Sequence, residues 1–500
     1  MQINYIVVQA GGKGTRMEHL TQNKPKALVP VNNLPILFHL FQQFSDKKFI
    51  VIGDYKFDVL EKYLKVFAKV SYSLVDAHGK SGTSGGLKDA VSLIPPGNPF
   101  MLIWSDLILS KDFHFPEKEA NYIGVAKDFR CRWKYEQNRF TEETSDNAGV
   151  AGLFFFRDKM SLKQVPSEGE FVRWLKDSDI LFEELPIWHT KEYGLYSVYG
   201  KLPVQRCRPF NSLTVEGDCI IKKAVDSRGA ELAKHEYAWY KALENTHLQN
   251  LPKIFSFSPL KMERIKGKNV YEYPDLPIRQ KQKILEQIVG CLKEVQSLGQ
   301  VKADRKSYEE AYIGKTFDRL ETIRDLVPFA NDSVVCVNGK SCRNVFFHRE
   351  ELQKMVDEYI PERFKLIHGD CTFSNILLRE DGTPVLIDPR GYFGFTELYG
   401  DPAYDWAKLY YSIVGDYDQF NLKRFRLKIN EKDVELEIET NGWRELESYF
   451  FELLKDDVEE KQIRLLHAII WLSLTTYAWD DYDSICGAFY NGLYYLEDLL

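Results

Sequence analysis

The chain has 500 residues, of which 44% are hydrophobic and 28% are charged, and its formal net charge is −7. This length exceeds what one hydrophobic core usually supports, so we expect two or three globular domains. The acidic balance argues against nucleic acid as the main partner, since such surfaces need clustered lysine and arginine. No apolar run approaches the roughly 20 residues that cross a bilayer, and nothing after Met1 resembles a signal peptide. These features predict a soluble, cytoplasmic protein that binds neither nucleic acid nor membrane.

The cysteines predict neither a disulfide framework nor a zinc site. The sequence contains no C-x-x-C pair, and no histidine-rich segment that could complete a zinc site accompanies the cysteines. We interpret them as reduced structural thiols, as is usual inside cells. The eight positions are 131, 207, 219, 291, 336, 342, 371 and 486.

The first part of the chain alternates short apolar runs with amphipathic stretches. Strands are predicted over residues 3–9, 49–53, 70–75 and 100–104, and helices over 36–44, 57–67 and 87–93. Strands that alternate with helices of this length predict parallel βαβ units. Residues 148–156 predict a further buried strand.

The pattern changes near residue 205. Residues 211–225 predict a β-hairpin that turns at 216–218, and a helix follows over 230–244. From about residue 277 long amphipathic helices dominate, interrupted by a loop at 368–370 and a hairpin around 380–382. We therefore expect one domain over 1–204 and a second over 205–500.

A glycine-rich segment follows the first predicted strand. Glycine lets backbone N–H groups approach phosphate oxygens closely, and nearby cations balance the charge of a triphosphate and of a transition state. The candidate nucleotide-binding residues here are Gly11, Gly12, Lys13, Gly14 and Thr15. The candidate catalytic cations are Arg16 and Lys26.

The string G-G-x-G-T-R-M, followed by P-K-x-L at 25–28, resembles the nucleotidyltransferases that make activated sugars and alcohols. The resemblance covers roughly residues 1–200 and implies a Rossmann-like, doubly wound α/β domain. It also implies that GTSGGL at 82–87 contacts base and sugar through Gly82, Thr83 and Gly85. Asp106 matches the magnesium-binding aspartate of the family, and its place at a strand end suits ligand binding.

The second metal carboxylate of that family lies in a D-x-G-T stretch. The nearest match here is E-Y-G-L at 192–195, which has glutamate for aspartate and leucine for threonine. Glu192 is therefore the candidate, and its role stays open. The implied reaction is attack of a substrate phosphate on the α-phosphorus of a nucleoside triphosphate, with pyrophosphate leaving. It needs no general base, because the attacking phosphate is already ionised.

A second phosphate-handling motif lies far along the chain, in HGDCTFSN at 368–375. Asp370 and Asn375 have the spacing of a kinase catalytic loop, in which aspartate accepts the hydroxyl proton and asparagine holds magnesium. Asp388, which ends the apolar run V-L-I, is the candidate second metal carboxylate. His368 has no partner at zinc-ligand spacing and is expected to orient the loop.

Upstream, Lys222 on a predicted strand and Glu236 on the next helix are typical of the pair that aims ATP phosphates in kinases. Lys223 is the alternative to Lys222, since successive strand residues face opposite ways. With Asp370, Asn375 and Asp388, this set resembles the aminoglycoside phosphotransferase and choline kinase family over about residues 207–500.

That resemblance implies a bilobal α+β kinase-like domain with an N-lobe over 205–275 and a mostly helical C-lobe over 276–500. It implies ATP as phosphate donor and Mg²⁺ at this site, as the first resemblance implies Mg²⁺ and a second nucleotide (CTP, UTP or GTP). It also implies that Asp405, in GDPAYDWAKL, braces the catalytic loop.

Residues 471–483, WLSLTTYAWDDYD, are rich in aromatic and acidic side chains. They would suit a quaternary ammonium ion, through cation–π contacts, or a sugar, through stacking and hydroxyl binding. A stripe of aromatic residues at helical spacing is also typical of core. This segment therefore leaves the substrate open.

The two motifs together predict a bifunctional enzyme. The kinase would phosphorylate a small hydroxyl compound, and the nucleotidyltransferase would convert the product into an NDP-activated precursor of a surface polysaccharide or capsule. A sugar or polyol is favoured over choline or another amino alcohol, because the GGKGTRM and GTSGGL strings are closer to the sugar-1-phosphate branch. Two alternatives stay open: a kinase-like half that only binds or regulates, and a glycosyltransferase in the first half.

Overall fold

The computed structural model describes residues 1–202 and 211–500. Its chain forms two compact units, Met1–Pro203 with Trp479–Asp483, and Val204–Ala478 with Ser484–Leu500. The first unit thus includes five residues that the sequence-based division placed in the second domain. The predicted boundary between 204 and 205 lies outside the described residues, as does Cys207, and the division at that point stays a prediction.

The first unit is built on a mixed β-sheet whose centre is parallel. Its central strands are β1 (Tyr5–Gln9), β4 (Lys48–Gly53), β5 (Ser71–Asp76) and β6 (Phe100–Trp104). The strand order along the main path is β10-β9-β11-β6-β1-β4-β5, and β1 pairs in parallel with both β4 and β6. The four predicted strands and their parallel pairing are confirmed, with ends that differ by at most two residues.

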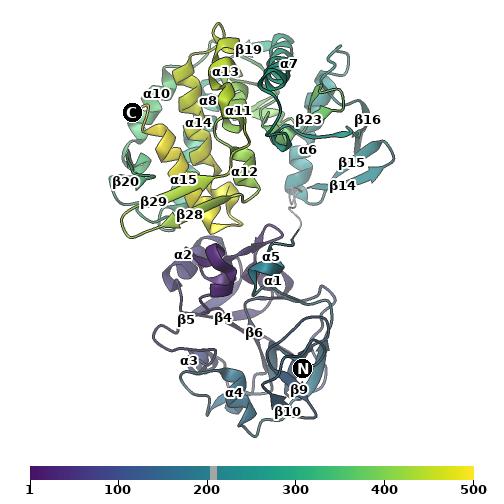
Figure 1. Ribbon diagram of the computed structural model, residues 1–500, viewed down its shortest axis with the longest axis vertical. Helices are drawn as coiled ribbons and strands as arrows, with labels where there is room; N and C mark the ends of the chain where they lie inside the picture. Colours follow the sequence, from purple (N-terminus) through teal and green to yellow (C-terminus); the bar gives the residue numbers. More distant parts are fainter. Residues whose placement is uncertain (203–210) are drawn as a thin grey trace. The chain divides into compact units, whose positions relative to one another are not determined.

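Helices cover both faces of this parallel region (Figure 1). Helices α1 (Ile36–Gln43) and α2 (Phe57–Phe67) lie on one side and α3 (Leu87–Ser92) on the other. Alternate residues of β4 account for this, since Phe49 stacks edge-on against Phe41 of α1 while Ile50 and Ile52 join the core that includes Leu87. Two-sided burial is why the strands read as continuous apolar runs.

An antiparallel extension continues the sheet beyond β6. Strand β11 (Gly149–Phe156), which the sequence predicted, runs antiparallel to β6 and also pairs with β8 (Tyr122–Ala126). A separate two-stranded ribbon joins β7 (Leu107–Ile108) to β13 (Lys191–Glu192). The other elements of the unit are β9 (Lys134–Glu136), β10 (Arg139–Thr141), β12 (Glu183–Ile187), β2 (Pro30–Val31), β3 (Leu34–Pro35), α4 (Phe171–Lys176) and α5 (Tyr196–Tyr199), with short helical turns at Thr15–Thr21, Lys26–Leu28 and Lys159–Leu162.

The second unit begins with a four-stranded antiparallel sheet in the order β14-β15-β17-β16. The predicted hairpin is confirmed, because β14 (Asn211–Glu216) and β15 (Cys219–Ala224) pair across a turn at Gly217. Helix α6 (Ser227–Ala242) starts three residues before its predicted start, because the Asp226 carboxylate caps it at the Gly229 amide. Strands β16 (Ile254–Phe257) and β17 (Leu260–Glu263) complete the sheet.

The rest of the second unit is mainly helical, as predicted. Its longer helices are α7 (Ile278–Ser297), α9 (Lys315–Ile323), α10 (Arg349–Asp357), α11 (Pro402–Ile413), α13 (Glu447–Leu454), α14 (Glu460–Leu474) and α15 (Tyr482–Leu496). The predicted hairpin near 380–382 is formed by β23 (Ile376–Arg379) and β24 (Pro384–Leu386), to which β18 (Gly267–Asn269) adds a third strand. A small sheet contains β19 (Gln300–Lys302), β22 (Arg363–Leu366) and β27 (Tyr399–Gly400). The shorter pieces are α8 (Arg305–Glu309), α12 (Tyr417–Asn421), β25 (Tyr392–Phe393), β26 (Thr396–Glu397), and helical turns at Val270–Glu272, Glu310–Gly314, Val345–Phe347, Phe373–Asn375, Arg444–Leu446 and Thr475–Ala478.

One sheet within this helical region was not predicted. It has the order β21-β20-β29-β28, formed by β20 (Val334–Val337), β21 (Lys340–Arg343), β28 (Phe425–Ile429) and β29 (Val434–Ile438). The sequences FRLKI and VELEI of β28 and β29 alternate apolar and charged residues with the period of two that marks a half-buried strand. The alternation is therefore visible in the sequence, although it spans only five residues in each strand.

No helix in the described ranges is both long and apolar enough to cross a bilayer. The seven cysteines that the structure describes are free thiols, as predicted.

Candidate active sites

The glycine loop of the first unit follows β1 directly, at the carboxyl end of the parallel strands. Gly14 adopts φ +63°, and a Cβ there would lie 3.1 Å from Cβ of Lys26. A Cβ on Gly11 would lie 2.9 Å from Cβ of Asp54, whereas one on Gly12 would meet no atom of the described residues within 4 Å. Crowding therefore accounts for glycine at 11 and 14, and Gly12 is the position that leaves open space for a ligand.

Lys13, Thr15 and Arg16 extend from this loop with exposed side chains. The loop at 82–85 is tied to the end of β1, because the side-chain amide of Gln9 donates to the carbonyl oxygens of Thr83 (2.8 Å) and Gly85 (3.1 Å). Gln9 was not singled out in the sequence, although it directly precedes the A-G-G string. It holds the two predicted nucleotide-binding loops side by side.

Within the second loop, the chain conformation itself requires glycine. Gly82 has φ +87°, and a Cβ there would overlap the carbonyl oxygen of Gly169. The hydroxyl of Thr83 accepts a hydrogen bond from the Phe171 amide at 2.8 Å, which ties the loop to the start of helix α4. A Cβ on Gly85 would overlap the Lys80 carbonyl.

Lys26, Asp106 and Glu192 come together at the end of β6. Nζ of Lys26 lies 2.6 Å from Oδ2 of Asp106. Antiparallel pairing of β13 with β7 sets Glu192 opposite Leu107, the residue after Asp106. Burial raises the pKa of Glu192, and the neighbouring Asp106 raises it further, while Lys26 and Arg16 oppose the shift.

These two carboxylates fit a bound Mg²⁺. Oδ1 of Asp106 is buried and makes no hydrogen bond to any described residue, so a cation ligand would satisfy it. A Cβ on Gly194 would overlap Oε1 of Glu192 and lie 3.2 Å from Oδ2 of Asp106. Glycine at 194 therefore leaves the two carboxylates room to converge. The described residues contain no cluster of three or more His, Cys, Asp or Glu at metal-binding distance.

In the second unit, Lys222 forms ion pairs with two carboxylates, and Lys223 forms neither of these two pairs. Nζ of Lys222 lies 2.8 Å from Oε2 of Glu236 and 2.7 Å from Oδ1 of Asp388. Lys223 is the neighbour on the opposite, exposed face of β15. Burial opposes the charge of Lys222, but Asp388 and Glu236 together raise its pKa above the usual value. The geometry therefore favours Lys222 over Lys223 as the nucleotide-binding lysine.

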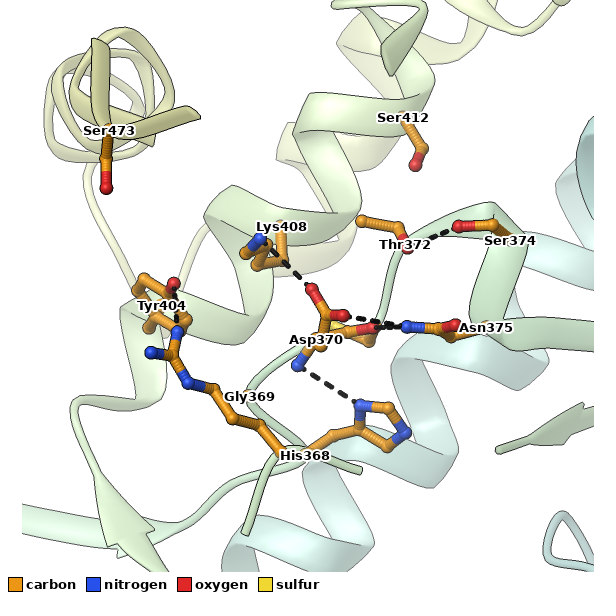
Figure 2. A network of polar contacts seen from close by, with 12 residues as sticks. His368, Gly369, Asp370, Thr372, Ser374, Asn375, Tyr404, Lys408, Ser412 and Ser473 are labelled. Carbon is orange, nitrogen blue, oxygen red and sulfur yellow. Dashed lines mark hydrogen bonds and ion pairs between the residues drawn. The ribbon is translucent and has the colours of Figure 1, made fainter. Parts of the chain in front are cut away.

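Asp370 lies at the centre of a polar network in the catalytic loop (Figure 2). Its Oδ1 accepts from Nζ of Lys408 at 3.0 Å, and its Oδ2 accepts from Nδ2 of Asn375 at 2.9 Å. Asn375 lies five residues after Asp370, as the kinase spacing predicts, and its Oδ1 is the atom that would hold Mg²⁺ together with Asp388. Asp388 has φ +55°, a strained backbone conformation for this residue.

Asp405 braces the catalytic loop by hydrogen bonds to its backbone, as predicted. Its buried carboxylate accepts from the backbone amides of His368 (3.0 Å) and Gly369 (2.7 Å), and burial raises its pKa to about 6. His368 is also buried, which lowers its pKa to about 4, so the ring is neutral near pH 7. Its Nε2 donates to the Ile387 carbonyl (3.1 Å) and its Nδ1 accepts from the Asp370 amide (3.3 Å). His368 thus positions the loop.

One cavity of about 180 Å³ lies within the second unit. Lys222, Glu236 and Asp388 line it together with Asp370, so the predicted ATP-binding and catalytic residues open onto a common space. Five further cations, none of them predicted from the sequence, also line the cavity: Arg228, Lys315, Arg319, Arg390 and Lys408. Lys315 and Arg319 are four residues apart on α9, a spacing that places them on one face, but charges on a helix usually indicate a solvated surface.

The aromatic and acidic segment 471–483 divides between different environments. Trp471 is buried in the core, with ring centroids 4.7 Å from Tyr411 and 5.0 Å from Phe420. Tyr477 lines the cavity. The carboxylates of Asp481 and Asp483 belong to the first unit, where they bind the buried Lys24. The two acids are therefore engaged with a lysine and do not form part of the described cavity lining.

Comparison with known proteins gives a different match for each half. Residues 5–123 match the family model described as nucleotidyl transferase, and residues 210–432 match that of the phosphotransferase enzyme family. Both families are those that the motifs indicated, and the mixed α/β fold class predicted for the chain is confirmed.

Among curated relatives, the beta catalytic subunit of mannose-1-phosphate guanylyltransferase from Drosophila pseudoobscura pseudoobscura is 36% identical over 118 residues, which are 22% of this chain and 31% of the relative. The D-glycero-alpha-D-manno-heptose 1-phosphate guanylyltransferase of Campylobacter jejuni is 28% identical over 210 residues, covering 40% of this chain and 89% of the relative. The chain spans about a third of the length of the mannose-1-phosphate guanylyltransferases that it matches. A solved structure, HddC from Yersinia pseudotuberculosis, is 20% identical, with 40% of this chain and 98% of that chain covered and a TM-score of 0.34.

Proposed function

We propose that the chain is a bifunctional enzyme that activates a small hydroxyl compound in two consecutive steps. The kinase half transfers the γ-phosphoryl group of ATP to the compound. The nucleotidyltransferase half then joins the new phosphate to a nucleotide from CTP, UTP or GTP and releases pyrophosphate. The product is an NDP-activated precursor of a surface polysaccharide. The observation that carries this proposal is that one chain matches both families and has a complete set of polar groups for each step.

In the first half, chain residues would position charges rather than move protons. The glycine loop, with Gly12 open, and the 82–85 loop would hold the nucleotide, and Lys13 and Arg16 would bind triphosphate oxygens. Asp106 and Glu192 would hold Mg²⁺, which supplies charge neutralisation at the phosphates when bound. Lys26, 2.6 Å from Asp106, would stabilise the negative charge that develops as the acceptor phosphate attacks.

In the second half, Asp370 would act as the general base. Its carboxylate would accept the proton of the acceptor hydroxyl while the hydroxyl oxygen attacks the γ-phosphorus. Lys222, fixed by Glu236, would bind the α- and β-phosphates. Asn375 and Asp388 would hold Mg²⁺, which neutralises phosphate charge when bound.

A sugar or sugar-like polyol is the favoured acceptor. Support comes from the relatives of the first half, since both curated relatives described above are named for sugar 1-phosphates. Choline or another amino alcohol, with a phosphocholine-type cytidylyltransferase step, is the alternative. The carboxylates Asp481 and Asp483, which would have suited a quaternary ammonium ion, are engaged with Lys24.

A kinase-like half that only binds ligand is the second alternative. It would not need the full arrangement of catalytic groups, yet Lys222, Glu236, Asp370, Asn375 and Asp388 are all present and four of them line one cavity. Glycosyl transfer by the first half is disfavoured, because the GGKGTR loop and Lys26 suit a triphosphate. Release of pyrophosphate would distinguish nucleotidyl from glycosyl transfer.

The experiment uses the intact protein with ATP, Mg²⁺ and, in separate reactions, CTP, UTP, GTP or dTTP. The acceptors are hexoses, hexosamines, heptoses, glycerol, ethanolamine and choline, and mass spectrometry identifies the products. We expect an NDP conjugate only when ATP and one second nucleotide are both present. An NDP conjugate of choline would overturn the sugar assignment. If supplied sugar phosphate gives a conjugate but ATP phosphorylates no acceptor, neutral or anionic, the kinase assignment is overturned.

A further inference from the structure

Three cationic side chains in the kinase-like cavity have no carboxylate partner. Lys315, Arg319 and Arg390 all line the cavity, and among the described residues no Asp or Glu oxygen lies within 4.0 Å of their charged nitrogens. By contrast, Lys222 is neutralised by Glu236 and Asp388. The cavity thus contains paired cations and an unpaired group, which we call the cation cluster: Lys315, Arg319 and Arg390.

The two arginines of the cluster are held in place by neutral groups. Nη1 of Arg390 donates to the Tyr404 hydroxyl at 2.9 Å and Nη2 to the Tyr392 hydroxyl at 3.2 Å. Arg319 donates to the backbone and side-chain oxygens of Ser473, the latter at 3.2 Å. Hydroxyl and carbonyl partners fix the direction of a guanidinium without forming an ion pair with it.

Lys315 lies one helical turn before Arg319 on α9 and makes no hydrogen bond or ion pair with any other residue that the structure describes. Its pKa is lowered well below the usual value by burial first, and then by the positive charges of Arg390, Arg319 and Lys408, while the Glu310 carboxylate opposes the shift without forming an ion pair. Burial and Arg390 also lower the pKa of Arg319. Like charges that repel each other in a half-buried site are unfavourable unless an anion binds between them.

The cluster lies in the same cavity as the catalytic base. Lys408, which is paired with Asp370, is close enough to Lys315 to depress its pKa, and Arg390 is the second residue after Asp388. The cluster therefore opens onto the same cavity as Asp370, and Arg390 follows Asp388 closely in the chain. An acceptor whose hydroxyl reaches Asp370 would place its remaining atoms against the cluster.

We propose that the acceptor of the kinase step is itself an anion, a hydroxyl compound with a phosphate or carboxylate group that Lys315, Arg319 and Arg390 bind. This inference rests on the proposed kinase function and narrows its substrate class to sugar phosphates, sugar acids and related hydroxy acids. Arginine pairs match the planar oxygens of both groups. Choline is disfavoured, because its ammonium charge would join three cations that already repel one another.

The reaction keeps this anion unchanged. The acceptor hydroxyl oxygen forms a bond to the γ-phosphorus of ATP, and the bond between that phosphorus and the β–γ bridging oxygen breaks. ADP leaves with the electron pair of that bond, and the hydroxyl proton passes to Asp370. The product therefore carries two anionic groups, the original one and the new phosphate, and an NDP conjugate made from it would retain the first.

The first test compares acceptors that share a carbon skeleton and differ in charge. The intact protein is assayed with ATP and Mg²⁺ on glycerol, glycerol 3-phosphate and glycerate, on glucose, glucose 6-phosphate and glucuronate, and on choline. We expect kcat/KM for one anionic acceptor to exceed that of its neutral analogue by about 100-fold or more. Comparison of the phosphate with the carboxylate acceptor then shows which of the two anionic groups the site binds. A neutral sugar or choline as the better substrate would overturn the proposal.

Two substitutions connect the preference to the cluster. Lys315→Met and Arg319→Gln should each raise KM for the anionic acceptor by about tenfold or more while changing KM for ATP by less than about twofold. Lys306→Met is the matched control, because Lys306 is exposed on α8 outside the cavity, and its KM values should equal those of the native protein. An unchanged ratio of anionic to neutral kcat/KM in Lys315→Met would contradict the proposal.

A second test does not depend on catalysis. Pyridoxal 5′-phosphate and uncharged pyridoxal both form an imine with a lysine amine, releasing water, and borohydride reduces that imine to a stable amine. With ADP and Mg²⁺ present to shield Lys222, peptide mass spectrometry should find Lys315 labelled about tenfold faster by the phosphate form, and this preference should disappear in Arg319→Gln. Equal labelling by both reagents would overturn the anion site even if the kinase is active. Selective labelling without any phosphorylated acceptor would keep the anion site and reject the kinase function.

Discussion

The Lys408 ammonium lies 3.0 Å from Oδ1 of Asp370, while the side-chain amide of Asn375 lies 2.9 Å from Oδ2. Each carboxylate oxygen of the proposed base therefore has its own fixed partner, one from α11 and one from the catalytic loop (Figure 2). Such an arrangement holds the carboxylate in one orientation before substrate arrives, which lowers the entropic cost of reaching the transition state. Lys408 was not foreseen in the sequence, although it lies three residues after the bracing Asp405.

Asp370→Asn is expected to remove the kinase step alone. An amide cannot accept the hydroxyl proton, so kcat for acceptor phosphorylation should fall by about 10²- to 10⁴-fold, while conversion of supplied sugar phosphate to NDP-sugar continues. The measurement is ADP release and pyrophosphate release in parallel assays. Asp381→Asn, in the exposed turn between β23 and β24, is the control and should keep both rates. Equal kinase rates in the native and Asp370→Asn proteins would refute the assignment of the base.

Lys222→Met and Lys223→Met form a matched pair, since the two lysines are adjacent on β15 and face opposite ways. Lys222→Met leaves the buried carboxylate of Glu236 without its lysine and removes the charge for ATP phosphates. We expect KM for ATP to rise by about tenfold, or about 1.4 kcal/mol of transition-state binding. Lys223→Met should leave KM within about twofold. Steady-state kinetics at varied ATP concentration measure both KM values. A raised KM for ATP in Lys223→Met, with an unchanged KM in Lys222→Met, would assign ATP binding to Lys223.

The fold was predictable wherever periodicity and turn residues agreed. Strand β6 was predicted residue for residue, because FMLIW is an uninterrupted apolar run between a glycine-proline turn and Asp106. Helix α2 was likewise correct at both ends. The β28–β29 hairpin was missed although its apolar and charged residues alternate with the period of a strand, because each strand has only five residues and lies between longer helical patterns.

The candidate sites were predictable where one local string carries the chemistry. Asp370 and Asn375 lie five residues apart, so their spacing alone indicates the loop. The cation cluster was not predictable, because Lys315, Arg319 and Arg390 are separated by up to 75 residues and only the packing of α9 and the loop after β24 brings them to one cavity. Gln9 was missed for the same reason, since its partners lie 74 and 76 residues away.

Glu192→Gln tests the second metal carboxylate of the first unit. Replacing the carboxylate removes one of two charged oxygen ligands, so the Mg²⁺ concentration that gives half-maximal nucleotidyl transfer should rise by about tenfold or more. The Mg²⁺ dependence of the kinase step should not change. Titrations of both activities with Mg²⁺ make the comparison, and Glu61→Gln, on the exposed face of α2, is the control. If Glu192→Gln shifts neither titration, Asp106 holds the metal without Glu192.

His467→Gln should weaken the pH dependence of stability. His467 is buried on α14, where its Nε2 accepts from the Trp471 indole at 3.0 Å. Burial, and then Arg444 and Arg464, lower its pKa from 6.5 to about 3. Between pH 6.5 and 3 the unfolded chain therefore binds a proton that the folded chain does not, so the stability that His467 contributes above pH 6.5 is lost as the pH falls.

For the native protein, this linkage should remove about 2 kcal/mol of unfolding free energy between pH 7.5 and pH 5. Glutamine can accept the indole hydrogen bond through its amide oxygen but does not titrate, so the variant should lose about 2 kcal/mol less over the same range. Urea unfolding followed by tryptophan fluorescence at the two pH values measures the difference. His247→Gln, at an exposed position of the same unit, should retain the native pH dependence. If His467→Gln loses as much stability as the native protein between pH 7.5 and pH 5, the buried histidine is not the group that titrates.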